Sequence, residues 1–519
     1  MAFRRYTASA DNTIVSAYQQ NLETRGTGAN AGRADVVEVF SIYGRQATAS
    51  QELSRYLVKF PITTVSAERT NGTIPASGSV SFYLKMYRAV TSKTVPVDYA
   101  LQTIAVTTDW QEGIGLDLEN YQDLVKGNLG SDWVQARKDT NWTSVGGDYM
   151  GESDSGGDFS YSQTFRTGLE DLEIDITPMV ERWIGGTNNY GMLVKLAGNY
   201  EASASQGYVN QDANVIYNQT GATDSYYTKR FFARGTQFFY KRPTIEARWN
   251  STTRDDRTNF FYSSSRATGA DNLNTIYFYN IIRGRLRNLP GVSAGGDVLV
   301  SLYSGSSNNS APSGSQLTIY AANSAIGSTV TEVTGGNVST GIYSCSIAAT
   351  AAATPLKTLY DVWWTGSAAT YKEYFTGSIL PLTFDTGMTN VLPTYYINLT
   401  NLKNTYTTSE TVRLQLYARE KDWKPNIYTV ANNSPDVTPI NSASYRVYRL
   451  LDNYDAVPYG TGSQNHTGLS YDVSGNYFDF NMNVLEAGYA YAFKFAFYDE
   501  DIKSWQEQDA AFKFRVEED

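Results

Sequence analysis

Cysteine and histidine are almost absent from this chain of 519 residues, which contains one of each. A single cysteine, Cys345, excludes an intramolecular disulfide framework. One cysteine and one histidine cannot assemble a His- or Cys-based zinc site within one chain. A Ser-His-Asp triad would depend on His466 alone, which lies in a turn-like loop, so we expect none. The alternating sequence around Cys345 predicts a strand, with the thiol as a small core residue or a plain surface thiol.

Long apolar runs are also missing. No stretch approaches 18 apolar residues, so we expect no membrane-spanning helix. The sequence begins Met-Ala-Phe-Arg-Arg-Tyr-Thr, without an apolar region, which predicts the absence of a secretory signal and synthesis in a cytoplasm.

There is no excess of positive charge. The formal net charge is −10 and the isoelectric point is near 4.9. This balance argues against a general nucleic-acid-binding protein, because such binding needs a basic footprint. The short basic run of Arg283, Arg285 and Arg287 does not reverse it, and we expect these side chains on the solvent face of a strand.

Recognisable catalytic motifs are missing too. The chain has no Walker loop and no HExxH, GxSxG or CxxC sequence. The pairs Asp255-Asp256 and Asp499-Glu500 are adjacent in sequence, whereas a glycosidase needs two carboxylates on opposite sides of one bond. We therefore predict a protein that is not an enzyme and needs no cofactor.

The residues that are abundant favour β-structure. The chain has 40 Tyr and 42 Gly, and 14% of its residues are aromatic. Tyrosine, threonine and valine favour strands, and glycine, asparagine and serine favour the turns between them. The chain is too long for one core. We predict an all-β protein with three domains, at residues 1–250, 251–388 and 389–519.

The clearest local pattern lies at residues 172–196, which read as a strand, a short helix and a second strand. Thr177 is expected to be the N-cap and Pro178 the first helical residue. Trp183 shares a helical face with Val180 and Ile184, which predicts a core position. Gly185-Gly186 would end the helix, and Tyr190-Gly191 would start the next strand.

Other segments surround this unit in a specific order. An alternating strand at 55–60, another at 80–87 and the sequence Trp110-Gln-Glu112 come before it, and Arg242-Pro243-Thr-Ile comes after it. This order resembles the DNRLRE-type domain, a jelly-roll β-sandwich related to some carbohydrate-binding modules. The W-x-E-x-T-W segment of that family matches only through Trp110 and Glu112. The resemblance implies a jelly roll for residues 1–250 and says little about chemistry. In it, Thr177, Pro178, Trp183, Tyr190 and Gly191 are fold-signature residues.

The two later regions repeat one plan. Residues 340–347 correspond to 474–480, and residues 359–364 correspond to 490–495, in the same order. Such a repeat suggests tandem immunoglobulin-like sandwiches, although the Cys–Trp–Cys signature is missing.

Two sets of residues suggest binding. Asp148, Glu152, Asp154 and Asp158 could hold calcium, but they lack EF-hand spacing, so the sequence favours a plain acidic loop. Trp110 and Trp142, which lie in predicted turns, could stack on sugar rings, although the sequence favours aromatic residues that fill sandwich cores and protein interfaces.

These patterns lead to a functional expectation. We expect a structural component of a tailed-bacteriophage virion: an appendage, neck or collar, decoration or fibre-associated protein. It would be assembled with other virion proteins in the host cytoplasm, in several symmetric copies. A carbohydrate-binding adhesin that recognises a host-surface glycan is the alternative, and a non-catalytic module of a polysaccharide-degrading system is a third reading.

Overall fold

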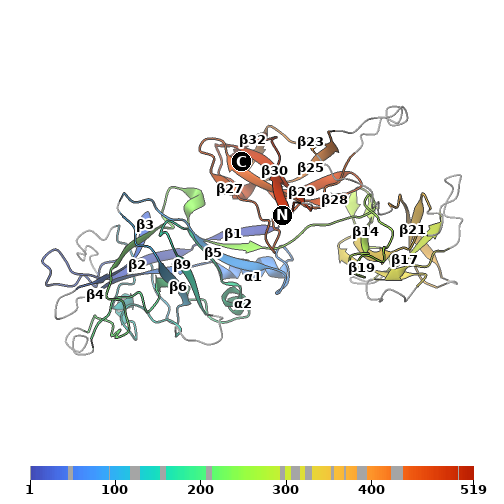
Figure 1. Ribbon diagram of the computed structural model, residues 1–519. Coiled ribbons are helices and arrows are strands. Elements are labelled where there is room, and N and C mark those ends of the chain that lie inside the picture. The colour runs from blue at the N-terminus through green and yellow to red at the C-terminus, as the bar shows by residue number, and fades with distance from the viewer. Residues whose placement is uncertain are drawn as a thin grey trace. The chain divides into compact units, whose positions relative to one another are not determined.

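Two compact units make up the part of the chain that the structure describes. The computed structural model describes residues 2–44, 51–92, 94–116, 129–151, 159–205, 213–292, 298–304, 316–321, 330–351, 356–367, 370–382, 394–421, 437–500 and 502–519 (Figure 1). The first unit contains residues 2–250 with Gly462–His466, and the second contains Ser251–Thr461 with Thr467–Asp519. Both consist mainly of antiparallel sheets, which confirms the all-β fold class. The boundary predicted at residue 388 lies inside the second unit and stays a prediction.

The first unit is built from two sheets. The first sheet has the order β1 (Phe3–Thr7), β13 (Thr244–Arg248), β5 (Ser81–Met86), β10 (Leu172–Asp175). The centre of the second sheet has the order β4 (Gln51–Lys59), β11 (Met192–Leu196), β6 (Tyr99–Ala105), β9 (Ser160–Phe165). Beyond β4 lie β3 (Val36–Tyr43) and β12 (Tyr226–Phe232), and β2 (Ala10–Ser16) also pairs with β4.

The strand order is that of a jelly roll. Counted along the chain, the eight strands of the two four-stranded groups follow the orders 1-8-3-6 and 2-7-4-5. Neighbouring strands in both groups are antiparallel. This interleaving of early and late strands is produced by the two Greek keys of that fold.

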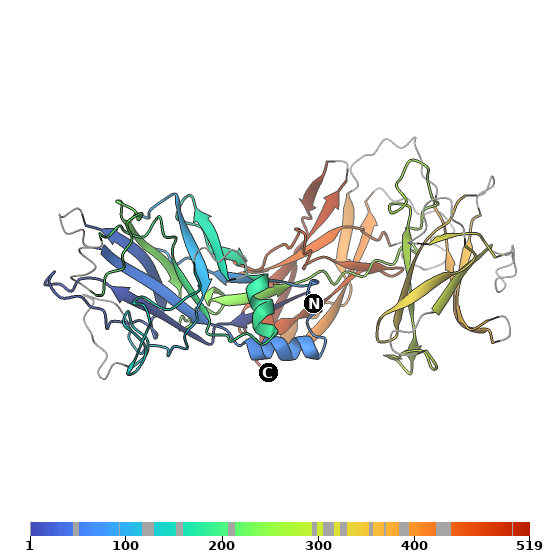
Figure 2. The same cartoon turned by 90° about the horizontal axis from the view of Figure 1, so that it is seen from below.

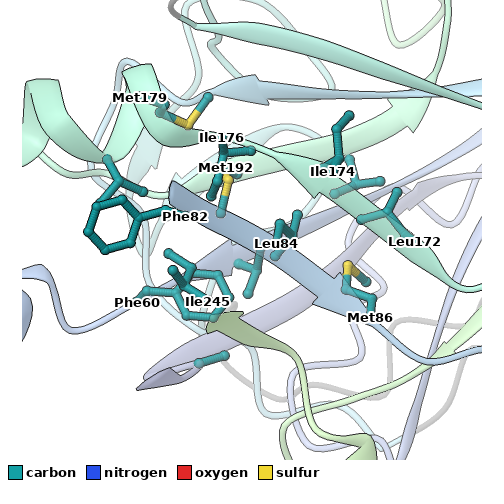
Figure 3. Close-up of a cluster of buried hydrophobic side chains, with 14 of the residues drawn as sticks. Phe60, Phe82, Leu84, Met86, Leu172, Ile174, Ile176, Met179, Met192 and Ile245 are labelled. Carbon is teal, nitrogen blue, oxygen red and sulfur yellow. The ribbon is translucent and has the colours of Figure 1, made fainter. Parts of the chain in front are cut away.

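The core of the first unit lies between its two sheets (Figure 3). Phe82, Leu84 and Met86 alternate along β5 and continue the pattern of Val80 just before it, and each side chain is exposed by 4% or less. The side chains that face them include Met192 from β11. Period-2 burial therefore fixes which face of each strand points inward.

Two α-helices occur in the described ranges, α1 (Ile62–Thr70) and α2 (Thr177–Ile184), and they pack against each other (Figure 2). Arg69 on α1 donates two hydrogen bonds to Glu181 on α2, at 2.5 and 2.7 Å. Trp183 is buried in the core, as predicted. Neither helix of the described residues is long and apolar enough to cross a membrane.

The predicted start of α2 needs correction. The N-cap is Ile176, no side chain caps the helix, and Thr177 is the first helical residue, so Pro178 is the second. The Thr177 hydroxyl instead donates to Asp175 and accepts the backbone N–H of Phe82. The threonine therefore fastens the helix to β5, and this use of its hydroxyl explains why it does not cap.

The later part of the strand–helix–strand segment at residues 172–196 agrees better with the prediction. The helix ends at Ile184, followed by Gly185 as C-cap and Gly186 with φ +102°. Strand β11 begins at Met192, two residues after the predicted start at Tyr190, because Gly191 has φ +84° and is not extended.

Two immunoglobulin-like strand arrangements make up the second unit. In the first, one group of neighbouring strands is β14 (Asn274–Tyr279), β20 (Ile342–Ala348) and β19 (Val333–Ser339), and the other is β17 (Val298–Ser304), β21 (Leu359–Thr365) and β22 (Lys372–Ile379). Strand β19 also pairs with β17, so the two groups join into one continuous sheet. In chain order these are the B-E-D and C-F-G groups of an immunoglobulin sandwich. Phe261 and Leu382 form a parallel bridge, which sets the first segment beside the last, as strands A and G. The short β18 (Tyr320–Ala321) pairs with β20, and β15 (Ile281–Ile282) forms a hairpin with β16 (Arg285–Leu286).

More strands of the second arrangement fall within the described residues. One sheet has the order β23 (Tyr395–Leu399), β25 (Thr411–Glu420), β29 (Gly475–Asn481), β28 (Ser470–Asp472), which is A-B-E-D. The other has the order β24 (Thr405–Thr407), β32 (Phe512–Glu517), β30 (Ala490–Asp499), β26 (Ala443–Arg449), β27 (Asp455–Val457), with β31 (Ser504–Glu507) paired to β30. The predicted correspondence of segments is observed, since β20 and β29 both take position E, and β21 and β30 both take position F.

Candidate binding site

A cavity of about 740 Å³ lies at the outer face of the second sheet of the jelly roll. Alternation along β4 directs Tyr56 and Val58 into the core between the sheets, and Arg55 to the opposite face. The lining consists of Arg55, Thr107, Thr108, Thr143, Ser144, Val145, Gly147, Asp148, Tyr149, Ala213 and Ile216. The cavity is therefore built from one strand and several loops of the first unit.

Arg55, Glu201 and Lys195 form a buried ion cluster at the wall of this cavity. Arg55 donates to both carboxylate oxygens of Glu201, each at 3.0 Å, and Lys195 Nζ lies 3.3 Å from Glu201 Oε2. The side chains of Arg55, Lys195 and Glu201 are exposed by 1%, 0% and 6%. Burial alone would raise the pKa of the Glu201 carboxyl, but the two cations hold it below its ordinary value.

The same arginine holds the loop that covers the sheet. Arg55 Nη1 donates to the Gly146 carbonyl at 2.9 Å, and its guanidinium lies 5.3 Å from the Trp133 ring centroid and 5.4 Å from that of Tyr149. Gly146 has φ +85°, and a Cβ atom there would lie 2.9 Å from Arg55 Nη1. A side chain at residue 146 would therefore disturb both the backbone and the arginine.

Of the four predicted calcium ligands, Asp148 is the one within the described residues. Its carboxylate stabilises this loop by accepting hydrogen bonds. Its oxygens accept the backbone N–H groups of Thr143 and Ser144, both at 2.9 Å, and the Thr108 hydroxyl at 2.8 Å. Burial would raise the pKa of Asp148, but these hydrogen bonds outweigh it and lower the pKa. The other three calcium candidates, Glu152, Asp154 and Asp158, lie outside the described residues. Within the described ranges no three His, Cys, Asp or Glu side chains are grouped to hold a metal ion.

The predicted sugar-stacking role of Trp110 and Trp142 does not fit their surroundings. Trp110 is 4% exposed and Trp142 is 5% exposed, and both belong to a hydrophobic cluster with Trp133. The indole N–H of Trp110 donates to the Tyr190 carbonyl and that of Trp142 to the Asp132 carbonyl. Neither ring has an open face for a sugar, because both pack under the loops that cover the second sheet.

The remaining motif residue, Glu112, also has a structural partner. Arg234 donates to both of its carboxylate oxygens, at 2.8 and 2.9 Å, and the backbone N–H of Asp11 donates to it at 2.9 Å. Asp11 accepts the Tyr56 hydroxyl at 3.1 Å and the Arg234 N–H at 2.7 Å. Burial raises the pKa of Asp11 to about 6, although these two hydrogen bonds oppose the shift.

The single histidine and the single cysteine are both buried. His466 belongs to the first unit, lies edge-on to the Phe3 ring, and has its pKa lowered by burial to about 4. Cys345 lies on β20 in the core of its sandwich, and burial raises the pKa of its thiol. The strand predicted around Cys345 is observed, with the thiol as a core residue.

Charge and hydroxyl groups define what the cavity could bind. The charged side chains of the lining are one cation, Arg55, and one carboxylate, Asp148, so their charges cancel. Around them, Thr107, Thr143, Ser144 and Tyr149 add hydroxyl groups to the lining. Such a wall suits a neutral, hydroxyl-rich ligand better than a strongly charged one.

Arg55 and Glu201 carry no sequence signal that links them, because they lie 146 residues apart. A cation within a strand, as at Arg55 on β4 and Lys195 on β11, was the local sign of a buried partner.

Comparison with known proteins adds little. No protein-family model and no curated protein matches the chain. Among solved structures it is similar to a DUF4785 family protein of Legionella pneumophila, with 8% identity and a TM-score of 0.13 over 84% of this chain and 90% of that one. It is also similar to trypsin-activated alpha-2-macroglobulin of Escherichia coli, with 10% identity and a TM-score of 0.15 over 83% of this chain and 29% of that one. Similarities this weak carry no argument, so the fold rests on the strand order itself, and the resemblance to the DNRLRE-type domain stays a prediction.

Proposed function

We propose that the chain is a non-enzymatic structural component of a bacteriophage virion that works through protein–protein assembly. One observation carries this proposal: the polar and aromatic side chains around the cavity of the jelly roll are engaged in contacts within the jelly roll itself. Arg55 on β4 holds the covering loop at Gly146, and Asp148 joins residues within that loop. Trp110 and Trp142 are buried in one hydrophobic cluster with side chains of the second sheet, and their indole N–H groups donate to backbone carbonyls. Internal contacts of this kind make the domain rigid, and a rigid domain suits a protein that keeps its neighbours in a particle at a fixed spacing.

The tandem sandwiches support the same proposal. Each immunoglobulin-like arrangement sets a segment near its start beside its end. The Phe261–Leu382 bridge does so in one, and in the other β24, which follows the first strand β23, runs parallel to the last strand β32. Pairing of this kind covers backbone groups of an edge strand that could otherwise pair with another chain. Loops and hairpins are then left to contact other proteins.

Mass spectrometry of particles purified from the host that carries this gene tests the proposal. The chain should be present at a fixed ratio to the major capsid protein, and an antibody against it should label one position on the particle. A chain that is abundant in the lysate but absent from washed particles would contradict a structural role.

The alternative, a glycan-binding adhesin, is favoured by one observation, the hydroxyl-lined cavity of about 740 Å³. Tyr149 and Thr107 line it, and neither side chain is part of the buried ion cluster. Polysaccharide pull-down with the full chain should then show saturable binding that Tyr149→Phe with Thr107→Val weakens. The matched control is Tyr217→Phe, an exposed tyrosine outside the lining. Absence of binding, or equal binding by all variants, would argue against the adhesin.

A further inference from the structure

The hairpin of β15 and β16 is exposed over its whole length. Ile281 pairs with Leu286 and Ile282 with Arg285, so aliphatic side chains occupy both of its faces. Ile281 is 61% exposed, Ile282 43% and Leu286 39%. An isolated two-stranded hairpin gains little stability from its own pairing, and apolar groups gain nothing from facing water. The exposed aliphatic side chains therefore suggest a surface that is covered by a partner.

The arginines of this hairpin are unpaired within the described part of the chain. Arg283, Arg285 and Arg287 take part in no ion pair there, and their side chains make no hydrogen bond with any described residue. Arg285 and Arg287 lie on the same face as Ile282, because they are two residues apart along one strand. Arginine is enriched at protein interfaces, and the buried centre of an interface is apolar.

The turn at the tip uses an unfavourable residue. Arg283 has φ +52° and Gly284 has φ +74°, as a type I′ turn requires. Asparagine or glycine adopts this left-handed conformation more readily than arginine. No described contact offsets the strain at Arg283, which points to a use of its side chain outside the chain.

The base of the hairpin is fixed. Asn280 donates its backbone N–H to the Gly341 carbonyl at 2.8 Å and its side-chain amide to the Arg287 carbonyl at 2.6 Å. The backbone N–H of Arg287 donates a hydrogen bond of 3.0 Å to the Asn280 carbonyl. A projecting element with an anchored base loses little conformational entropy when it binds.

Charge indicates the partner. The net charge of the chain is −10, so the chain without these three arginines carries −13. We propose that the hairpin docks on an acidic surface of a second copy of this chain. This inference rests on the proposed structural function, in which copies of the chain assemble. A polyanion is a poorer partner, because the remaining charge repels it and phosphates do not use the aliphatic side chains.

The same charge constrains the symmetry. A twofold contact of hairpin with hairpin would bring six arginines together, and like charges at an interface are strongly unfavourable. The contact must therefore join the hairpin of one copy to a different surface of the next. Interfaces of this kind close into rings or extend into fibres.

Sedimentation velocity of the full chain tests the proposal. The wild type should form larger species as its concentration rises, and more readily at about 50 mM than at about 500 mM salt. Arg285→Glu with Arg287→Glu should weaken the association at least about tenfold. The matched control is Arg266→Glu with Lys503→Glu, two exposed cations elsewhere with the same total change in charge. Ile281→Thr with Ile282→Thr should weaken the association without changing its salt dependence.

Three outcomes would overturn the inference: a wild type that stays monomeric at all concentrations, equal weakening by hairpin and control variants, or hairpin-dependent binding of an oligonucleotide or of anionic vesicles by a monomeric chain. Unchanged melting of the variants shows that they fold. If the chain is monomeric but present in purified particles, only the proposed hairpin contact is contradicted. If the chain self-associates but is absent from particles, only the proposed virion function is contradicted.

Discussion

Arg55 and Glu201 are joined by two hydrogen bonds of 3.0 Å, although 146 residues separate them in the sequence. Both side chains are buried, and Lys195 shares the same carboxylate. A buried charge is costly unless it is paired. Glu201 therefore allows two cations to stay inside the jelly roll, and one of them, Arg55, also holds the loop at Gly146.

Glu201→Gln should destabilise the first unit by about 3–5 kcal/mol, because it leaves Arg55 and Lys195 buried without a counter-charge. Calorimetry of the full chain should show the transition of the first unit at a lower temperature and that of the second unchanged. Glu23→Gln is the control, since Glu23 is exposed, and it should change stability by less than about 0.5 kcal/mol. Equal effects of the two substitutions would show that the cluster does not stabilise the fold.

The pKa of Asp11 predicts a pH effect of a definite sign. Its pKa is raised from 3.8 to about 6 in the folded chain, mainly by burial. Asp11 therefore binds a proton more tightly in the folded state than in the unfolded state. Protonation of Asp11 adds to the free energy of unfolding, and this contribution grows as the pH falls from about 6 towards 4. Asp11→Asn keeps an oxygen for Tyr56 and Arg234 but carries no charge. The variant should exceed the wild type in melting temperature above pH 6, and this advantage should shrink towards pH 4. An advantage that does not depend on pH would contradict the raised pKa.

Much of the fold could be predicted because it depends on local patterns. Alternation along β5 gives its buried face, and the repeated segments give positions E and F of both immunoglobulin-like arrangements. Helix α1 could not be predicted, since five of its nine residues, from Ile62 to Thr70, are β-branched and favour strands. Burial of Ile62 and Val65 and the contact between Arg69 and Glu181 override that preference.

The candidate site was much less predictable. Trp110 and Trp142 looked available because tryptophan serves in cores and on surfaces alike, and only the covering loops decide between the two. Asp148 looked like a metal ligand because a carboxylate in a glycine-rich loop can bind either a cation or backbone N–H groups. Two of its hydrogen bonds come from Thr143 and Ser144, nearby in the same loop, and the third comes from the distant Thr108. Only the folded loop brings these donors to the carboxylate, and Glu201 has no local pattern at all.

Trp183→Ala tests the role of α2 in the jelly roll. The ring is 5% exposed within the main core cluster, and truncating a buried tryptophan typically costs about 3–5 kcal/mol. The first transition of the full chain should fall while the second stays constant. Trp363→Ala, at a fully buried residue of the second unit, should have the reverse effect. A first transition unchanged by Trp183→Ala would show that the helix is not part of that core.

Gly191→Ala tests how closely β11 approaches its neighbour. Gly191 has φ +84°, and a Cβ atom there would lie 2.3 Å from the Val58 carbonyl oxygen on β4. Gly72 has a similar φ of +79°, but nothing lies within 4 Å of the corresponding Cβ position. Gly72→Ala should therefore cost only the backbone strain, about 1 kcal/mol. Gly191→Ala should cost at least twice as much in denaturant unfolding of the first unit, because the backbone of β4 must move. Equal costs would mean that left-handed backbone strain alone, and not the close approach of the two strands, requires glycine at residue 191.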